Sequence, residues 1–539
     1  MKKLGLLFSV FLFAVSGYAA PSQADAAFDA GNFAQALKIY QEELPQAASD
    51  AARYKVQLRI TACQYMLGQY AQAAKTIYGY SLPSDPLWKA RFLLYRIQTG
   101  ERVKNIYAPL LPQAQEENAS GNLEKWTAAQ WQQQITQDYQ TLWSLKETLA
   151  QAPIAQETLI LSVKDTDEKR IPTLFDFVLN QWKNYLASHA RPAPLAKAED
   201  FLAQPFAQQQ EDSSAVNQIA ALLKTGAELD GKNRQNAKLF WRTDLILLPF
   251  DYPQNFSFKD QKQAAVTAAK KLDEISGFTP AKRGWFGRIK GFVAPEKATY
   301  GKAYAAYRSA QLYEQAEQFE QSVAVCNFAA KKLDGNYYAK ACANLAADIQ
   351  APSLTVTAPV MNQNPQDLTL KVTARNIGRV YLRIYPITRA QLQKYSQNRW
   401  NKTFNSWNHL TVVNDTALRD ILSRQTPLKS LSGQVEYPAK HAFKQIDLKL
   451  PELESGFYVI AAAREESFDP DTAPVAATVL NVTDLALFVS AAIEDNPDKY
   501  TSLLNAKANT YTPNIFRIYA VNLKTGQPVE GAELDMFTE

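Results

Sequence analysis

The sequence predicts a multidomain protein that is α-helical first and β-stranded second. Residues 22 to about 350 are rich in Ala, Gln, Leu and Lys, and their apolar residues recur at three- and four-residue steps, which is typical of packed helices. From Pro352 the pattern changes to short runs of β-branched and aromatic residues, which is typical of strands. Turn signals between these runs favour antiparallel β-sandwiches. A chain of 539 residues has room for about two to four such domains.

The first 19 residues have the order of a secretion signal. Lys2 and Lys3 give a positive start, residues 4–15 an apolar run, and small residues before Ala20 a site for cleavage after Ala19. The alternative is a membrane anchor, but the run is too short to cross about 30 Å of hydrocarbon. We therefore expect an exported chain, periplasmic in a cell with two membranes and otherwise extracellular or on the cell surface.

The helical region, expected over 20–350, contains a repeat. AGNFAQALKIYQEELP and LGQYAQAAKTIYGYSLP each open a helix with a Gly-x-aromatic-x-x-Ala pattern that begins at Gly31 and at Gly68. A degenerate later copy carries Phe319 and Val323. The period resembles the tetratricopeptide repeat, a helix–turn–helix unit whose arrays present concave peptide-binding surfaces. The alternative is that these few imperfect units form a spacer or a platform.

Aromatic residues between the copies fit a helical core. Trp126, Trp131, Trp143 and Trp182 lie in segments with helical apolar spacing, so we expect them in the core of an α-solenoid rather than on a ligand platform. The glycine-broken stretch 281–301 could dock on a membrane or a partner, but its short length favours a loop held against the helices by its aromatics.

The positions of the three cysteines predict one disulfide and one free thiol. Two helical runs flank a break at residues 334–336, so an antiparallel helical hairpin would bring Cys342 back to Cys326. Disulfides persist in oxidising compartments, and we therefore predict a bond between these two residues. Cys63 lies in a helical segment without an obvious partner and is interpreted as a small buried apolar side chain.

The β-stranded part is expected to form two domains. The first covers 351–480 and includes a helical insertion at about 388–427, and the second covers 481–539. At its end, a strand over 518–523, turn residues 525–528 and an alternating run with Ala532, Leu534 and Met536 predict a β-hairpin. Because two strands alone are marginally stable, the hairpin calls for a second sheet, and we expect the second sandwich to be incomplete in this chain.

Four segments of the β-stranded part form a recognisable set: RNIGRVYLRIYPI (375–387), LPELESGFYVIAAAREESF (450–468), VTDLALFVSA (482–491) and TGQPVEGAEL (525–534). Together they resemble the opening macroglobulin-type domains of bacterial alpha-2-macroglobulin family proteins. The helical part, which includes IPTLFDFVLNQW, is similar to one branch of that family, in which helices precede the sandwiches.

The resemblance implies protease trapping, in which cleavage of a bait segment triggers rearrangement and an internal Cys–Gln thioester attaches the protease. All three cysteines of this sequence lie in helical, alanine-rich contexts, so none fits a thioester. The expectation is the scaffold portion of an endopeptidase inhibitor, without bait or thioester, with proteases as partners of the longer architecture. The alternative is an extracytoplasmic interaction module whose helical array binds a periplasmic or surface protein.

The residues offer little for other chemistry. His189, His409 and His441 have no metal-ligand spacing, and His189 ends a helix where the macrodipole favours a cation. Asp469 and Asp471 are conceivable calcium ligands, but an ordinary polar loop is favoured. We therefore expect no catalytic, cofactor-binding or metal-binding residues, and no enzyme. The 58 Lys and Arg against 53 Asp and Glu give +5, too little for a nucleic-acid surface, and no later segment is long enough to insert stably in a membrane.

Overall fold

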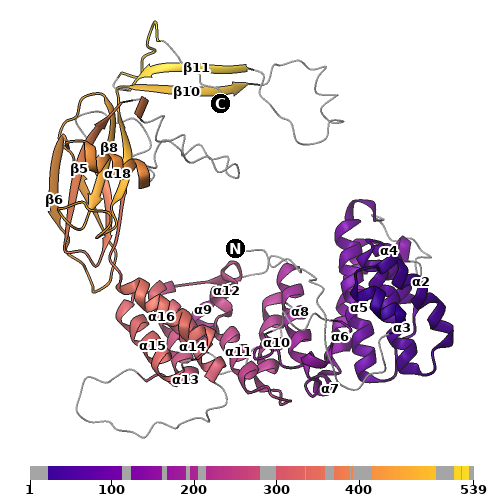
Figure 1. Ribbon diagram of the computed structural model, residues 1–539. Coiled ribbons are helices and arrows are strands. Elements are labelled where there is room, and N and C mark those ends of the chain that lie inside the picture. Colours follow the sequence, from indigo (N-terminus) through magenta and orange to yellow (C-terminus); the bar gives the residue numbers. More distant parts are fainter. Residues whose placement is uncertain are drawn as a thin grey trace, which may run out of the picture. The chain divides into compact units, whose positions relative to one another are not determined.

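The computed structural model divides the chain into two compact units, Met1–Ala346 and Ala347–Glu539 (Figure 1). The residues that it describes are 22–111, 123–160, 167–189, 195–203, 214–279, 299–333, 335–358, 369–388, 390–391, 415–492, 515–523 and 525–532. Cleavage at Ala19, most of the 281–301 stretch, most of the 388–427 insertion and the side chains of Leu534 and Met536 therefore lie outside the described residues. Helices come first and antiparallel sheets second, as predicted.

The first unit consists mainly of helices. The long helices have the lengths and buried stripes that their apolar spacing predicts, and neighbours along the chain pack against each other. The helices are α1 (Gln23–Asp29), α2 (Phe33–Glu43), α3 (Asp50–Met66), α4 (Tyr70–Gly79), α5 (Pro86–Ile106), α6 (Ala128–Trp143), α7 (Lys146–Leu149), α8 (Leu174–Ser188), α9 (Ala198–Ala203), α10 (Ala215–Glu228), α11 (Gln235–Ile246), α12 (Leu248–Asp251), α13 (Gln261–Ser276), α14 (Thr299–Gln315), α15 (Phe319–Lys332) and α16 (Tyr337–Gln350). Single 3₁₀ turns lie at Leu44–Gln46, Ala108–Leu110, Leu123–Lys125, Ile154–Gln156 and Pro253–Asn255.

The same turn occurs at all three copies of the repeat. Gly31, Gly68 and Glu317 have φ of 79°, 76° and 61°, and they join α1 to α2, α3 to α4, and α14 to α15. In each turn the next residue's N–H reaches a carbonyl five residues back, as in Asn32 to Ala27. Glycine adopts this left-handed conformation at no steric cost, so a glycine identifies the turn in two of the copies. The third copy has glutamate at this position and is therefore harder to recognise in the sequence.

The alanine of the repeat is buried where the two helices of a pair meet. Ala36 and Ala73 have no exposed surface, and in the third copy Ser322 takes this place, also fully buried. Its hydroxyl donates a hydrogen bond to the carbonyl of Ala310 on α14, at 2.8 Å. The serine is tolerated because this bond satisfies a polar group that burial would otherwise leave without a partner.

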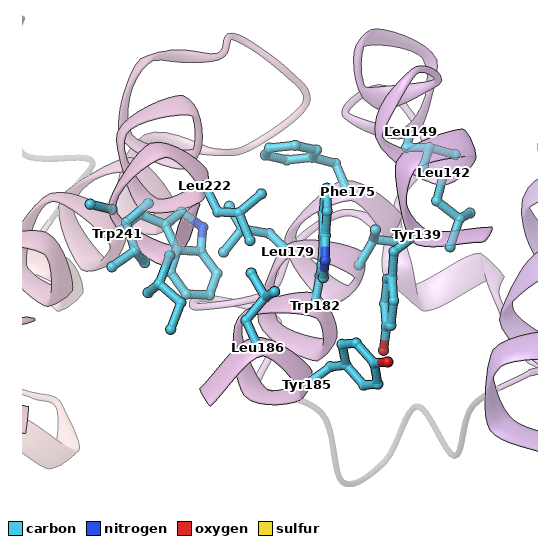
Figure 2. Packing of buried hydrophobic residues seen from close by; sticks show 14 of the residues in the cluster. Tyr139, Leu142, Leu149, Phe175, Leu179, Trp182, Tyr185, Leu186, Leu222 and Trp241 are labelled. Atoms are coloured by element: carbon cyan, nitrogen blue, oxygen red, sulfur yellow. The ribbon is translucent and has the colours of Figure 1, made fainter. Parts of the chain in front are cut away.

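The largest apolar cluster of the first unit joins α5, α6, α8, α10 and α11 (Figure 2). Trp182 is buried in this cluster with Trp143 packed beside it, whereas Trp131 is buried in a smaller cluster with Trp126 packed beside it. Both are edge-to-face pairs, with centroid distances of 5.4 and 4.9 Å. Tyr139 stacks on Trp182 with an angle of 5° between the rings. The prediction that the tryptophans belong to the core is confirmed.

The first unit is not entirely helical, which corrects the expectation for 20–350. Two short parallel strands, β1 (Ala196–Lys197) and β2 (Phe256–Ser257), pair with each other between helices. Each has only two residues, too few for a strand pattern to show in the sequence. The segment 126–149 is also broken, because α6 ends at Trp143 and α7 begins at Lys146.

The second unit contains two antiparallel sheets that share one core. Side chains from both sheets make up a single buried cluster, which includes Val372 and Leu370 from one sheet and Leu382 and Ile460 from the other. The three-stranded sheet has the order β3 (Ser353–Thr357), β4 (Thr369–Arg375), β7 (Lys444–Lys449), and the four-stranded sheet has the order β6 (Lys429–Gln434), β5 (Arg379–Ile387), β8 (Gly456–Ala463), β9 (Ala476–Val482).

The runs of β-branched and aromatic residues after Pro352 that predict strands account for most of these elements, but not for β6. Its sequence KSLSGQ is poor in strand-forming residues, and along it exposed residues outnumber half-buried ones. It lies at the edge of its sheet and pairs only with β5, with Leu382 opposite Leu431. Helix α18 (Asp415–Arg424) precedes it within the predicted insertion and packs Leu418 and Ile421 against the outer face of the same sheet.

A separate two-stranded ribbon follows. β10 (Leu485–Ala492) and β11 (Ile515–Asn522) pair antiparallel, with Leu487 opposite Ala520. The predicted turn after β11 is present, since the N–H of Asn522 donates to the carbonyl of Gln527 at 2.9 Å. Among the described residues, no helix has the length and apolar character needed to cross a bilayer.

Candidate partner-binding face of the helical region

The Cys326–Cys342 disulfide is present, and it links α15 to α16. Both residues have no exposed surface. Gly335, with φ of 86°, lies in the turn that reverses the chain between the two helices. The helical-hairpin argument therefore predicted this pair correctly.

Cys63 is a free, buried thiol, as predicted. Burial raises its pKa to about 12, although the positive charge of Arg59 acts in the opposite direction. A thiol reacts through its thiolate, which is scarce at neutral pH when the pKa is so high. Cys63 therefore packs in the core, and its raised pKa disfavours the reactive thiolate.

His189 caps the end of α8, but its surroundings favour a neutral ring over the expected cation. Its Nδ1 donates to the carbonyl of Tyr185 at 2.9 Å, and its Nε2 faces the ammonium of Lys104. Burial, together with the charge of Lys104, lowers the pKa of His189. These effects outweigh the attraction of the helix terminus for a positive charge, so the neutral ring is favoured.

The other histidines and aspartates considered in the sequence do not come together in one site among the described residues. His441 contacts Asn376, with Nδ1 2.8 Å from Oδ1, while His409 lies outside the described residues. Asp471 pairs with Arg419 at 2.7 Å, and Asp469 accepts the N–H of Asp471, which makes an ordinary polar turn. In the described part of the chain, no group of three or more His, Cys, Asp or Glu is placed to hold a metal ion.

Two buried carboxylates in the helical unit are structural. Asp176 is fully buried and accepts hydrogen bonds from Arg234, Thr173 and the indole N–H of Trp241. Asp244 would have a raised pKa from burial alone, but its cationic neighbours, chiefly Arg170, lower the pKa overall. These carboxylates and the cations that pair with them are satisfied within the fold and leave little for a ligand to bind.

A different arrangement lies at the first two repeat turns. An edge-to-face aromatic pair flanks each glycine, formed by the residue three before it and the residue two after it. Phe28 and Phe33 lie 5.3 Å apart, and Tyr65 and Tyr70 lie 5.1 Å apart. All four rings are partly exposed.

An arginine from the next helix pair covers one ring of each aromatic pair. The guanidinium carbon of Arg59 on α3 lies 4.1 Å from the ring centroid of Phe28, and that of Arg102 on α5 lies 4.8 Å from the centroid of Tyr70. Arg102 also donates to the hydroxyl of Tyr70 at 3.3 Å. We call these six residues, Phe28, Phe33, Arg59, Tyr65, Tyr70 and Arg102, the arginine–aromatic face.

Sequence reasoning missed this face. The glycine pattern was noticed, but the aromatic residue three positions before each glycine was not compared between copies. In the third copy that position is Glu314, so the arrangement is not repeated there. A search for arginines in the following helix would have pointed to Arg59 and Arg102.

Comparison with known proteins adds no assignment. No family model matches the sequence, and no curated protein matches it either. The resemblance to the alpha-2-macroglobulin family therefore remains a prediction.

Proposed function

We propose that this chain is the scaffold portion of an exported macroglobulin-like endopeptidase inhibitor, released after cleavage at Ala19. The observation that carries the proposal is the place of the resembling segments. RVYLRIYPI forms β5 and GFYVIAAA forms β8, and these are the two central, adjacent strands of the four-stranded sheet. A macroglobulin-type sandwich is the finer description of the two sheets that this proposal requires.

In this role the strands give rigidity rather than reactivity. Val380, Leu382 and Ile384 of β5 point into the shared core with no exposed surface, and Ile460 of β8 lies opposite Ile384. Alternation of buried and outward residues fixes the register, because a slip of one residue would turn the buried set outward. A sheet held in this way can position neighbouring domains of a longer inhibitor.

The gene beyond the codon for Glu539 tests the proposal. An open reading frame that encodes further sandwich segments and a Cys-Gly-Glu-Gln-like motif would support it. A stop codon at this position would contradict the inhibitor function.

A protease assay gives a complementary prediction. We expect the 539-residue chain alone to leave the activity of a protease panel unchanged on both a large and a small substrate, since neither a bait nor a thioester was recognised in its sequence. The product of the longer frame is the matched comparison. Stoichiometric protection of a protease by this chain alone would show an inhibitory site of another kind.

A second candidate function is a protein-interaction module. The repeated helix–turn–helix units favour it, because the turns at Gly31 and Gly68 have the same conformation and each presents an aromatic pair with one ring covered by an arginine. Under this proposal the units form a tetratricopeptide-like array, and the sheets act as spacers. Selection of peptides by the whole chain, described below, tests this function.

A further inference from the structure

We propose that the arginine–aromatic face binds an acidic, extended segment of a partner protein, with Arg59 and Arg102 each holding one carboxylate. This proposal rests on the interaction-module function and names the chemistry of its partner.

Arg59 has no hydrogen-bond acceptor of its own. Its Nε is buried, and the guanidinium has no hydrogen bond or ion pair among the described residues. Its charge helps to lower the pKa of Asp25, but Lys55 already reaches one oxygen of that carboxylate at 2.6 Å and Tyr40 the other at 2.7 Å. A carboxylate supplied by a ligand could therefore pair with the half-buried Arg59 side chain, in a charge-assisted hydrogen bond that the fold itself does not provide.

The aromatic rings hold both guanidinium groups in place. Arg59 lies over Phe28, and Arg102 lies over Tyr70, at distances that allow cation–π attraction. A guanidinium fixed by stacking loses less freedom when it forms a bidentate pair with a carboxylate. The two arginines lie in successive helix pairs, but Arg59 covers the ring that precedes its glycine and Arg102 the ring that follows its glycine, so the two contacts are similar in kind without being equivalent in position.

The spacing between the two arginines fits an extended segment. Tyr65 on α3 has a hydrogen bond with Gln98 on α5, and its pKa is influenced by the charge of Arg102, also on α5. Arg59, earlier on α3, acts through its charge on Tyr95, earlier on α5, so the two helices run in the same direction. Along the helix axes, the level of Arg59 lies about two turns, or about 10 Å, from that of Arg102. Packed helix axes are also about 8–10 Å apart, so the two levels are separated by about 13 Å in all. An extended chain covers this length in about four residues, and its side chains four positions apart lie on the same face, which predicts acidic residues four positions apart.

The charge of the two helices favours the same ligand. Helices α3 and α5 contain eight Lys and Arg but only two acidic residues, Asp50 and Glu101. The field of these helices therefore attracts an acidic segment. Nucleic acid is a poorer match, because its binding depends on many phosphate contacts and several of the other cations of these helices are already paired, as Arg53 is with Asp50 and Arg91 with Glu157.

The experiment starts with the full chain immobilised and a random peptide library displayed on phage. We expect selected peptides to carry Asp or Glu at positions four apart. One selected peptide, fluorescently labelled, is then titrated against the chain by anisotropy, beside its Glu→Gln form and a labelled oligothymidine. Arg59→Ala or Arg102→Ala should weaken binding of the acidic peptide about tenfold to a hundredfold, and Arg59→Lys should restore it only in part.

Arg53→Ala is the matched control, since Arg53 is on the same helix and lies over Tyr54 but is paired with Asp50. It should bind the peptide like the unaltered chain, and thermal unfolding of each variant checks that the fold is intact. The proposal would be overturned if the selected peptides lack acidic residues, or if Arg59→Ala leaves peptide binding unchanged. Either result would still be compatible with the interaction-module function. Tighter binding of oligothymidine at the same arginines would also overturn the acidic-segment proposal. If the library yields no binding peptide, both the acidic-segment proposal and the interaction-module function are contradicted.

Discussion

Arg234 and Arg59 belong to the same helical unit but have opposite surroundings. Arg234 is 1% exposed, and its guanidinium donates to both oxygens of Asp176 and to the carbonyls of Gly226 and Leu229. Arg59 keeps a buried Nε without any acceptor in the described part of the chain. The difference teaches that a buried charge with all its partners inside the fold holds helices together, whereas one with a missing partner is available to a ligand.

The largest expected effect comes from breaking the complete network. Arg234→Ala leaves the carboxylate of Asp176 buried without its cation, which should lower the free energy of unfolding by about 3–5 kcal/mol. Urea unfolding followed by circular dichroism measures this loss. The double variant Arg234→Met with Asp176→Leu removes both charges and should cost clearly less. If the free energy of unfolding falls equally in both variants, the ion pair with Asp176 is not the reason that Arg234 stabilises the fold.

Asp273 is an intermediate case, a carboxylate with hydrogen bonds but no cation among its described contacts. It is 4% exposed and accepts from the hydroxyls of Ser309 at 2.6 Å and Tyr313 at 2.8 Å. Burial raises its pKa to about 6, from 3.8, despite these two bonds. The folded protein therefore binds a proton more readily than the unfolded chain between these two pKa values, so the contribution of Asp273 to stability falls as pH rises through this window.

This sign gives a pH-dependent prediction. From pH 5 to pH 7 the contribution of Asp273 should fall by about 1 kcal/mol. Asp273→Asn should remove this part of the pH dependence, and urea unfolding of both proteins at the two pH values measures it. Asp138, whose pKa burial also raises to about 6, remains in both proteins and cancels in the comparison. An unchanged difference between pH 5 and pH 7 would show that Asp273 is ionised throughout.

The smallest expected effect is that of Arg59→Ala on stability. The variant loses the contact with Phe28 but also removes a buried donor without an acceptor, and these changes oppose each other. We expect the free energy of unfolding to change by less than about 0.5 kcal/mol, measured as for Arg234→Ala. A loss as large as that of Arg234→Ala would place Arg59 among the structural residues and remove the contrast.

The sequence predicted those parts of the fold that repeat or alternate. The glycines at 31 and 68 marked the helical turns because only glycine takes a left-handed conformation without cost. The buried strands β5 and β8 were evident from their apolar runs. The Cys326–Cys342 pair followed from a helical hairpin, which brings residues on both sides of a turn together.

The sequence did not predict features that depend on contacts between distant segments. Strand β6 is polar and exists because β5 offers it a free edge. The pKa of His189 depends on Lys104, which comes from another helix. Arg59 became a candidate only once the fold showed that Asp25 is occupied by Lys55 and Tyr40. The local sequence pattern does not show which hydrogen-bond acceptors already have partners in the folded protein.

The three cysteines also have a consequence for the order of folding. Cys326 and Cys342 are 16 residues apart, whereas a bond from Cys63 to either would close a loop more than an order of magnitude longer. Loop closure alone disfavours these long-range bonds by about 2 kcal/mol. Once α3 has packed, Cys63 is inaccessible and its thiolate scarce. Mispairing is thus opposed twice, first by chain entropy while the protein is unfolded and then by burial, and oxidation can proceed to the native bond without a rearranging enzyme.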